Sequence, residues 1–243
     1  MISKSVIDNP MSEAQIEEMF SSIATKYDLL NDILSLGLHR RWKNLAAQEA
    51  GLSRGDRALD LCTGTGDVAL ALASRVGPEG QVVAVDLSSP MIEYARKKSS
   101  DQEFKSIINF RIGNACDLEF CDDFFDAVTI AFGARNVRNL ERLFGEAFRV
   151  LKPRGRMVCL EFSPPRLTFL GHLYGIYLRH LVPFLGVLLA RHREAYSYLA
   201  TSICSFPEPG ALVEIMNKAG FGRVTYRRLN LGVVTLHVGI KET

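Results

Sequence analysis

The stretch that decides the fold of this chain is ALDLCTGTGDVALALASRVGPEGQVVAVD, residues 58–86. It begins with a short apolar run, Ala58–Cys62, which is followed by the glycine turn Gly64-Thr65-Gly66 and a run of helix formers. A second apolar run, Gln81–Val85, ends on Asp86. A strand, a glycine turn, a helix, a strand and an acid in this order predict the first half of a doubly wound nucleotide-binding sheet.

The turn and the acid indicate how a ligand would bind. Glycines let a ligand approach the backbone, the helix that begins near Asp67 offers free N–H groups to an anion, and Asp86 is placed to accept two ribose hydroxyls. Two ligand classes fit, a dinucleotide and S-adenosylmethionine, and Gly64, Gly66 and Ala69 also satisfy the dinucleotide pattern G-x-G-x-x-A. A tight turn that binds nothing is the third interpretation, and the remainder of the chain must decide among them.

The composition is that of an ordinary globular protein, with 243 residues of which 47% are hydrophobic and 23% charged. The net charge of +2 is too small to indicate a nucleic-acid partner. The cysteines are odd in number and form no C-x-x-C pair, so we predict buried thiols in a reducing compartment rather than disulfides or metal ligands. They are Cys62, Cys116, Cys121, Cys159 and Cys204.

The longest apolar region is Leu167–Ala190. Arg179 in its middle argues against a membrane-spanning helix, which needs about 20 mostly apolar residues. The polar N-terminus has no apolar signal core, so we expect a cytoplasmic protein. The apolar region either packs on the sheet or forms a cap that admits a hydrophobic substrate or rests on a membrane surface. We favour the cap, because apolar residues surround most of the circumference of this region.

Polar or glycine-rich residues follow four of the predicted strands. Besides 58–62 and 81–85, strands are predicted over 107–112, 125–131 and 156–162, and helices over 42–50, 88–100 and 140–151. The carboxyl ends of parallel strands meet at one edge of a sheet, where the ligands of such folds bind. The residues that fall at this edge are Asp86, Asn114, Arg135, Asn136 and Glu161. A buried fold alone would not require all of them there, so we predict a ligand site.

Two further strands are predicted over 222–229 and 233–240, joined by Asn230-Leu231-Gly232. The tight connection predicts an antiparallel pair at the edge of the sheet. A parallel dinucleotide sheet has no reason to end in this way, whereas the methyltransferase version of the fold normally does. The hairpin therefore favours S-adenosylmethionine over NAD.

Residues 27–43 form the densest polar and aromatic stretch of the chain. This stretch either caps the core, with a solvated face made by Arg40, Arg41 and Lys43, or lines a site with its Tyr, Asp, Asn, His and Trp side chains. Within one structural domain we distinguish an N-terminal helical cap (1–50), an S-adenosylmethionine-binding Rossmann-like core (51–165), a helical cap insertion (166–220) and a strand hairpin that completes the sheet (221–243).

Four motifs outside the glycine turn give the chain a family resemblance. They are Tyr27-Asp28-x-Leu30-Asn31-x-x-Leu34-Ser35-x-x-x-His39-x-x-Trp42, Phe132-Gly133-Ala134-Arg135-Asn136-Val137, Arg149-Val150-Leu151-Lys152-Pro153-Arg154-Gly155 with Glu161-Phe162-Ser163, and Gly232-Val233-Val234-Thr235-Leu236-His237. Through them the chain resembles the bacterial ubiquinone/menaquinone C-methyltransferase family over essentially Phe20–Lys241. Leu30 stands where this family usually has methionine, and Arg154 stands where it usually has glycine.

The resemblance implies the α/β fold of class I S-adenosylmethionine-dependent methyltransferases. This fold is a Rossmann-like seven-stranded sheet with a C-terminal antiparallel hairpin, here with N-terminal helices and a helical cap insertion. The implied cofactor is S-adenosyl-L-methionine, without a metal, and its implied binding residues are Gly64, Thr65, Gly66, Asp86, Asn114, Ala115 and Ala131. Some members have serine in place of Ala131, so a hydroxyl contact is absent there and a backbone contact remains.

The implied reaction is C-methylation of a prenylated quinol ring, with demethylmenaquinol, a methoxy-polyprenyl-benzoquinol or both as the acceptor. The acceptor must be reduced, because loss of a phenolic proton makes the ortho ring carbon nucleophilic, whereas the quinone is an electrophile. Arg135 would stabilise the phenolate. Asp28, His39 and Tyr27 are unranked candidates to relay the proton, and Asn136 completes the implied catalytic set.

Two other functions stay open. An NAD-dependent oxidoreductase is supported by the glycine pattern and Asp86, but no Tyr-x-x-x-Lys pair follows the fourth or fifth strand. A non-catalytic scaffold with the same fold is the other alternative. For the enzyme we expect a prenylated quinol, the inner face of a membrane and a second copy of the chain as partners, and no nucleic acid. Charges introduced at Leu178 or Phe184 are predicted to raise KM for long-tailed quinols. The flanking Arg179, Arg191 and Arg193 are predicted to contact anionic lipid headgroups.

Overall fold

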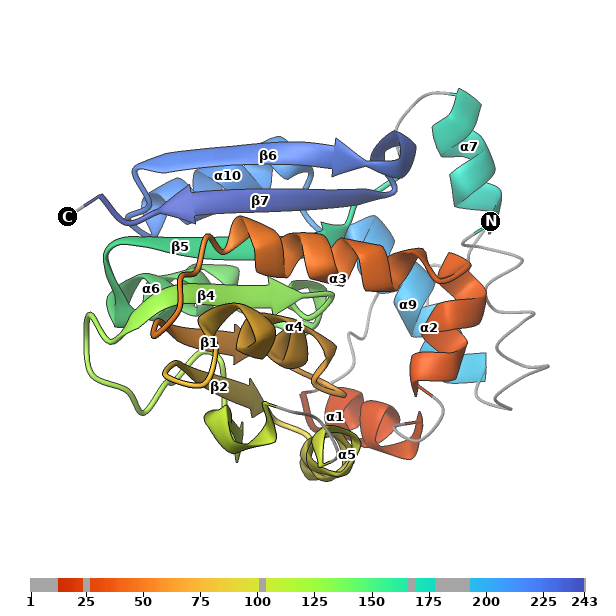
Figure 1. The fold of residues 1–243 in the computed structure, drawn as a ribbon. Coiled ribbons are helices and arrows are strands. Elements are labelled where there is room, and N and C mark those ends of the chain that lie inside the picture. The colour runs from red at the N-terminus through yellow and green to blue at the C-terminus, as the bar shows by residue number, and fades with distance from the viewer. Residues whose placement is uncertain (1–12, 24–26, 101–103, 166–168, 178–192, 243) are drawn as a thin grey trace.

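The computed structural model describes residues 13–23, 27–100, 104–165, 169–177 and 193–242. Its strands are β1 (Arg57–Leu61), β2 (Gln81–Asp86), β3 (Ile108–Ile112), β4 (Phe125–Ala131), β5 (Leu151–Phe162), β6 (Arg223–Leu229) and β7 (Val234–Ile240). They form one sheet of order β3-β2-β1-β4-β5-β7-β6 (Figure 1). The pairs among β1 to β5 are parallel, and β7 is antiparallel to both β5 and β6. The predicted doubly wound sheet with an antiparallel hairpin is therefore confirmed.

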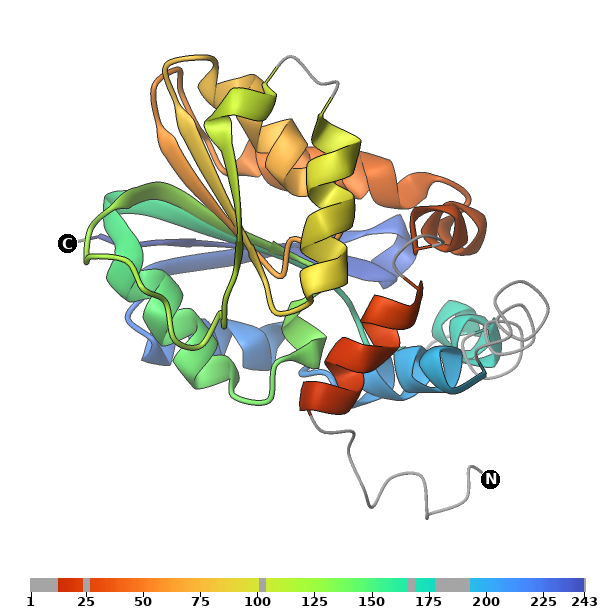
Figure 2. The same ribbon diagram turned by 90° about the horizontal axis from the view of Figure 1, so that it is seen from below.

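Helices cover both faces of this sheet. They are α1 (Glu13–Ile23), α2 (Tyr27–Ser35), α3 (Leu38–Glu49), α4 (Asp67–Val76), α5 (Ser89–Ser99), α6 (Leu140–Val150), α7 (Phe169–Ile176), α9 (Arg193–Ser205) and α10 (Pro209–Lys218), with the 3-10 turns η3 (Lys105–Ile107), η4 (Ala134–Asn136) and η6 (Asn230–Gly232). α3, α4 and α5 lie on one face and α6 and α10 on the other (Figures 1 and 2). Each face has its own hydrophobic core. Because side chains alternate along a strand, Ala58 packs in the core under α3, α4 and α5, while Leu59 and Leu61 pack in the core under α6 and α10.

The observed bounds differ from the predicted ones most at β5. The sequence predicts a strand from Arg156, but β5 begins at Leu151, which pairs with Phe125 of β4. The register then shifts between Phe125 and Ala127. Pro153 therefore lies in an irregular part of the strand, where its missing N–H interrupts no regular ladder of hydrogen bonds.

Helices α1, α2, α7 and α9 lie at the carboxyl end of the parallel strands (Figure 1). A small third core joins Leu30 of α2 to Ala200 and Ile203 of α9. The Tyr177 hydroxyl, directly after α7, donates a hydrogen bond to the Leu34 carbonyl of α2 at 2.8 Å. The edge of the sheet at which ligands bind is thus covered by helices from two distant parts of the chain.

The structure bears on two expectations about exposure. Of the two alternatives for residues 27–43, the solvated face of Arg40, Arg41 and Lys43 does not extend to Lys43, which is buried and whose ammonium group pairs with Asp67 at 2.8 Å across the contact between α3 and α4. All five thiols are free, as expected, yet Cys121 and Cys204 are exposed rather than buried. Cys121 lies in the loop before β4 and Cys204 near the end of α9, where the sequence pattern was too short to show which side faces the core.

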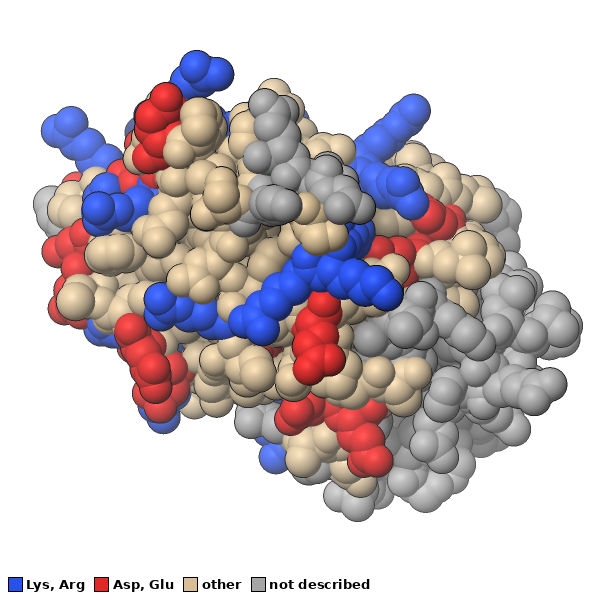
Figure 3. All heavy atoms as spheres, turned by 60° about the horizontal axis from the view of Figure 1, so that its bottom comes forward, with Lys and Arg blue, Asp and Glu red and all other residues tan. Residues whose placement is uncertain are grey.

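No helix in the described part of the chain combines the length and the apolar character needed to cross a membrane. The face shown in Figure 3 carries charges of both signs, with a short band of Lys and Arg side chains and acidic side chains close to it. This mixture agrees with the net charge of +2. Of the predicted cap Leu167–Ala190, the structure describes residues 169–177; Leu178, Arg179, Phe184 and Arg191 lie outside the described residues, as does the side chain of Arg193.

Candidate functional site

A cavity lies at the carboxyl edge of the sheet, where β1, β2, β3 and β4 end. α1 and α2 contribute Ile16, Glu17 and Tyr27 to its wall. The space that its residues enclose, open mouth included, is about 1060 Å³. The predicted cofactor-binding residues that line it are Gly64, Thr65, Asp86, Asn114, Ala115 and Ala131. Gly66 is not in this lining; it caps α4 with a φ of 82°.

The backbone at this edge is held in unusual conformations. Cys62 after β1 and Phe132 after β4 have positive φ values of 52° and 59° although neither is glycine. The two loops are in close contact, because a Cβ on Gly133 would lie 2.4 Å from the Cβ of Cys62. Backbone strain of this kind persists where the surroundings enforce it and is concentrated at functional sites. Gly133 is therefore required by packing between the ends of β1 and β4.

Asp86 at the end of β2 is fixed by two backbone donors. Its Oδ2 accepts the N–H of Gly64 at 2.8 Å and its Oδ1 accepts the N–H of Ser88 at 2.9 Å. Burial raises the pKa of this carboxyl, and the two backbone N–H groups act in the opposite direction. Each carboxylate oxygen has further lone pairs for a ligand hydroxyl. The glycine loop and the acid are thus one preassembled unit.

Asp60 is a site residue that the sequence analysis missed. It lies in β1, is 1% exposed and lines the cavity. Its carboxylate accepts the hydroxyls of Thr63 at 2.6 Å and Thr129 at 2.7 Å. Burial raises the pKa of Asp60 to about 6, although both hydroxyls and the nearby Lys43 oppose this. A carboxylate in this position can receive a ligand ammonium group, and the signal that could have found it is an acid inside an otherwise apolar strand.

Asn114 follows β3 and is held by its own turn. Its Oδ1 accepts the backbone N–H of Cys116 at 2.9 Å, which fixes the orientation of the amide. The amide NH₂ group of such a side chain can donate to a heterocyclic nitrogen. Together, Asp60, Asp86 and Asn114 give the cavity acceptors for a cation and for hydroxyls, and a donor for an aromatic ring edge.

Arg135 forms a buried ion pair with Glu161 beside the cavity. The two side chains are 4% and 1% exposed, and Nη1 of Arg135 lies 2.8 Å from Oε1 of Glu161. The guanidinium also donates to the Phe132 carbonyl. Burial acts to lower the pKa of Arg135, but the charge of Glu161 and its hydrogen bond outweigh burial, so this pKa is raised. Glu161, which the sequence placed at this edge without a role, is the partner that keeps a buried arginine charged.

Phenol groups surround this ion pair. Tyr198 of α9 donates to the side-chain carbonyl of Asn136 at 3.1 Å, and Asn136 and Tyr27 line the cavity. The Tyr174 hydroxyl is buried and finds no hydrogen-bond partner among the described residues. Its pKa is raised by burial. Tyr27 and Asn136 thus bring a phenol and an amide to the cavity wall near Arg135.

Two predicted catalytic residues lie elsewhere. Asp28 and His39 line a second cavity on the other side of Thr65 and are not part of the first. His39 is 4% exposed and its Nδ1 lies 2.9 Å from the Ser35 hydroxyl. Burial, followed by the charge of Lys43, lowers the pKa of His39. The structure thus brings Tyr27, Arg135 and Asn136 to the cavity region and separates Asp28 and His39 from it.

A model of the ubiE/COQ5 methyltransferase family matches residues 9–241 of this chain. The ubiquinone/menaquinone biosynthesis C-methyltransferase UbiE of Serratia proteamaculans (strain 568) is 42% identical over 229 residues, which cover 94% of this chain and 91% of the relative. The protein of the same name from Yersinia pestis bv. Antiqua (strain Antiqua) is 43% identical over the same length and coverage.

Solved structures match the fold. The cyclase SpnF has a TM-score of 0.70 at 16% identity, covering 96% of each chain. A SAM-dependent methyltransferase from Aquifex aeolicus has a TM-score of 0.57 at 19% identity, covering 79% of this chain and 86% of its own. At these identities the likeness is one of fold alone. Because one of the two is a cyclase, the fold does not by itself specify a reaction.

Proposed function

The chain belongs to the ubiE/COQ5 methyltransferase family, and on this premise we propose that it transfers a methyl group from S-adenosylmethionine to a ring carbon of a prenylated quinol. The resemblance inferred from the four sequence motifs is confirmed by the family match. The match also decides against the NAD-dependent oxidoreductase, since the family is one of methyltransferases. The quinol is supported by the relatives' names, which place them in ubiquinone and menaquinone biosynthesis.

The donor set of the cavity fits S-adenosylmethionine. Asp60 would receive the ammonium group, Asp86 the ribose hydroxyls and Asn114 the adenine edge. When bound, this cofactor supplies an electrophilic methyl group on a sulfonium centre. The chain contributes position and orientation, because methyl transfer needs little covalent help from the protein when donor and acceptor are held in line.

The single observation that carries the acceptor assignment is the Arg135–Glu161 pair next to the cofactor cavity. We assign to Arg135 the stabilisation of negative charge on a ring oxygen, which lowers the pKa of a phenol and raises the electron density at the ortho carbon. The Nε of Arg135 is buried and has no hydrogen-bond partner among the described residues. Tyr27 and Asn136, which line the cavity, are the proposed neighbours of the ring.

Demethylmenaquinol and a methoxy-polyprenyl-benzoquinol are both proposed acceptors, in agreement with the double name of the relatives. The contact with a membrane surface and with a second copy of the chain remain predictions from the sequence. The residues on which the membrane contact was argued, Leu178, Arg179, Phe184 and Arg191, lie outside the described part of the chain.

Methyl transfer is expected to require reduction of the acceptor. The purified protein, a prenylated demethylquinone and S-adenosylmethionine should give methylated product in the presence of dithionite and essentially none in its absence. The reason is that only the quinol has a nucleophilic ring carbon. Product is measured by mass spectrometry of the extracted quinone.

A mixture without protein controls for chemical methylation, and S-adenosylhomocysteine formation, measured separately, reports turnover of the cofactor. Equal product with and without dithionite would contradict the proposed chemistry. No product with either quinol head group, from a protein that binds the cofactor, would favour the scaffold alternative.

Cofactor affinity is expected to fall as the pH is lowered through about 6, the pKa of Asp60. Only the ionised carboxylate attracts the ligand ammonium group, which stays protonated below pH ~8. Below this pKa the affinity for S-adenosylhomocysteine should decrease by about tenfold per pH unit. Calorimetric titrations between pH 5 and pH 8 measure this change, and Asp60→Asn should bind weakly and without this pH dependence.

Protonation of Asp60 would not lower the affinity for S-adenosylhomocysteine by unfolding the protein. The pKa of Asp60 in the folded protein is raised above its ordinary value of 3.8. The folded state therefore binds this proton more strongly than the unfolded chain, and protonation of Asp60 at low pH favours folding. Thermal melts at each pH provide the control, and parallel pH profiles for the wild type and Asp60→Asn would contradict the role of this group.

A further inference from the structure

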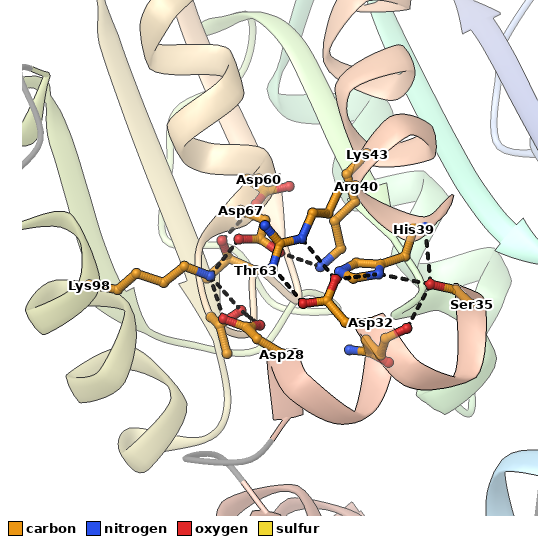
Figure 4. A network of polar contacts seen from close by, with 12 residues as sticks. Asp28, Asp32, Ser35, His39, Arg40, Lys43, Asp60, Thr63, Asp67 and Lys98 are labelled. Carbon is orange, nitrogen blue, oxygen red and sulfur yellow. Dashed lines mark hydrogen bonds and ion pairs between the residues drawn. The ribbon is translucent and has the colours of Figure 1, made fainter. Parts of the chain in front are cut away.

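A network of charged side chains lies beside the cofactor cavity and has no part in the proposed reaction (Figure 4). Lys98 lies at one end of it, with its ammonium nitrogen 2.5 Å from Asp28 Oδ2 and 2.5 Å from Asp67 Oδ1. Lys43 holds the other oxygen of Asp67 at 2.8 Å. Lys43 also lines both this second cavity and the cofactor cavity, so the two are neighbours.

The network connects helices that are far apart in the sequence. Asp28 is the second residue of α2, Asp67 is the first residue of α4, and Lys98 is the second-to-last residue of α5. The Thr65 hydroxyl, in the glycine loop, donates to Asp28 Oδ1 at 2.7 Å. The carboxylate of Asp28 therefore accepts one hydrogen bond from the glycine loop and one from Lys98. We call Lys98, Asp28, Asp67 and Thr65 the Lys98 latch.

The charges of the latch are partly shielded from water. The exposed fractions of the side chains are 27% for Lys98, 20% for Asp28 and 24% for Asp67. Burial acts to raise the pKa of Asp67, but Lys43 and Lys98 outweigh it and hold this pKa far below the ordinary value. Burial acts to lower the pKa of Lys98, and Asp67 and Asp28 raise it. Asp67 and Lys98 are therefore both ionised at neutral pH, in a place where an ion pair is screened less than at the surface.

Helix α2 is also held by contacts along its length, since the Tyr177 hydroxyl donates a hydrogen bond to the Leu34 carbonyl at 2.8 Å and Asp32 pairs with Arg40 of α3. Its Leu30 belongs to the small third core and its Leu34 packs against that core, whereas Leu29 is 61% exposed. Tyr27, the residue before Asp28, lines the cofactor cavity. The latch is thus a polar contact that joins the first turn of α2, next to Tyr27, to the glycine loop and to α5.

The preceding helix, α1, also borders the cofactor cavity. Its Ile16 and Glu17 line the cofactor cavity, and Ser21 forms a hydrogen bond with Ser88 at 2.9 Å, next to Asp86. α1 and α2 therefore form one wall of the cavity. A ligand that fills the cavity is enclosed on this side as long as both helices stay in place.

We propose that Lys98 is a positioning residue that holds α2 over the cofactor cavity, so that the latch fixes Tyr27 and slows the release of the bound cofactor. This inference rests on the proposed function for the identity of the ligand. The geometry of the latch itself does not depend on it. Lys98 acts through Asp28 and Thr65 and touches no reacting atom.

The first test measures α2 in the ligand-free protein. Hydrogen exchange of the amides of residues 27–35 is expected to become about tenfold faster in Lys98→Met, since local opening reflects the contacts that hold a segment. Lys98→Arg should restore slow exchange, because it keeps the charge. Lys152→Met is the matched control: Lys152 pairs with Asp126 at 2.7 Å with comparable exposure, away from both cavities. It should leave exchange in α2 unchanged.

The second test measures the ligand. Release of S-adenosylhomocysteine, followed by stopped-flow displacement, should be about tenfold faster in Lys98→Met, with KM for S-adenosylmethionine raised by a similar factor. KM for the quinol and kcat should change less, because the acceptor residues are untouched. Lys98→Arg should be close to the wild type.

Two results would overturn the proposal. One is that hydrogen exchange in α2 is unchanged in a folded Lys98→Met protein. The other is that this exchange becomes faster while the rate of S-adenosylhomocysteine release stays the same. Where Lys98→Met does not fold, Asp28→Asn takes its place, because the amide still accepts from Thr65 but loses the charge that pairs with Lys98. A wild-type protein that binds no S-adenosylhomocysteine would contradict the proposed function and the release step together. Exchange in α2 would still decide separately whether the latch holds the helix.

Discussion

Asp86→Ala is expected to weaken the binding of S-adenosylhomocysteine by about 10- to 150-fold, since hydrogen bonds to a charged group contribute ~1.5–3 kcal/mol. The loss has two sources. The ribose hydroxyls lose a carboxylate acceptor, and the N–H of Gly64 loses the partner that holds the glycine loop in place. Calorimetry on the folded variant measures the change.

The matched control is Asp126→Ala. Asp126 also accepts a backbone N–H, from Arg57 at 2.9 Å, and lies outside the cofactor cavity. Its removal should leave affinity intact even if it reduces stability. The substitution Asp86→Ala should weaken the binding of adenosine as strongly as that of S-adenosylhomocysteine. It should not weaken the binding of methionine. Unchanged affinity for adenosine would mean that the ribose lies elsewhere.

Arg135→Met is expected to lower the free energy of unfolding by about 3–5 kcal/mol, because it leaves a buried carboxylate without its cation. Glu161 is 1% exposed and Arg135 4% exposed, so water does not replace the lost partner. Methyl transfer should also be lost, since no other cation is proposed beside the acceptor ring. Urea unfolding measures the first effect and single-turnover methyl transfer the second.

The double variant Arg135→Met with Glu161→Gln separates the two effects. The neutral amide of glutamine can still accept the N–H of Phe162, which Glu161 holds at 2.8 Å, but it places no charge in the core. More than half of the lost stability should return. Methyl transfer should not return, and its return would show that Arg135 has only a structural role.

Much of the fold could be predicted because its signals are local. The glycine turn, the apolar runs on either side of it and Asp86 lie within 30 residues of one another, and the parallel arrangement then places the ends of β1, β2, β3 and β4 side by side. This reasoning predicted the edge at which Asn114 and Asn136 lie, and both line the cavity. The start of β5 was not predicted, because the strand begins before an irregularity in its pairing with β4 between Phe125 and Ala127.

The parts of the site that could not be predicted depend on contacts between distant segments. Nothing near Lys43 in the sequence indicates that Asp67 will face it across α3 and α4. Asp28 belongs to the same motif as Tyr27, yet the two adjacent residues line different cavities because successive side chains of a helix point about 100° apart. A motif therefore identified both residues but could not separate a group that faces the ligand from one that holds the helix.

The position of β7 has a consequence for synthesis of the protein. β7 comes last of the seven strands in the chain, but it lies between β5 and β6 and pairs with both. On the ribosome, β5 therefore emerges long before its neighbour, and its edge, with the apolar run Met157–Leu160, remains open in the nascent chain. An open apolar strand edge is a template for pairing with other chains. The demand for chaperones should thus be greatest in the interval between the emergence of β5 and that of β7.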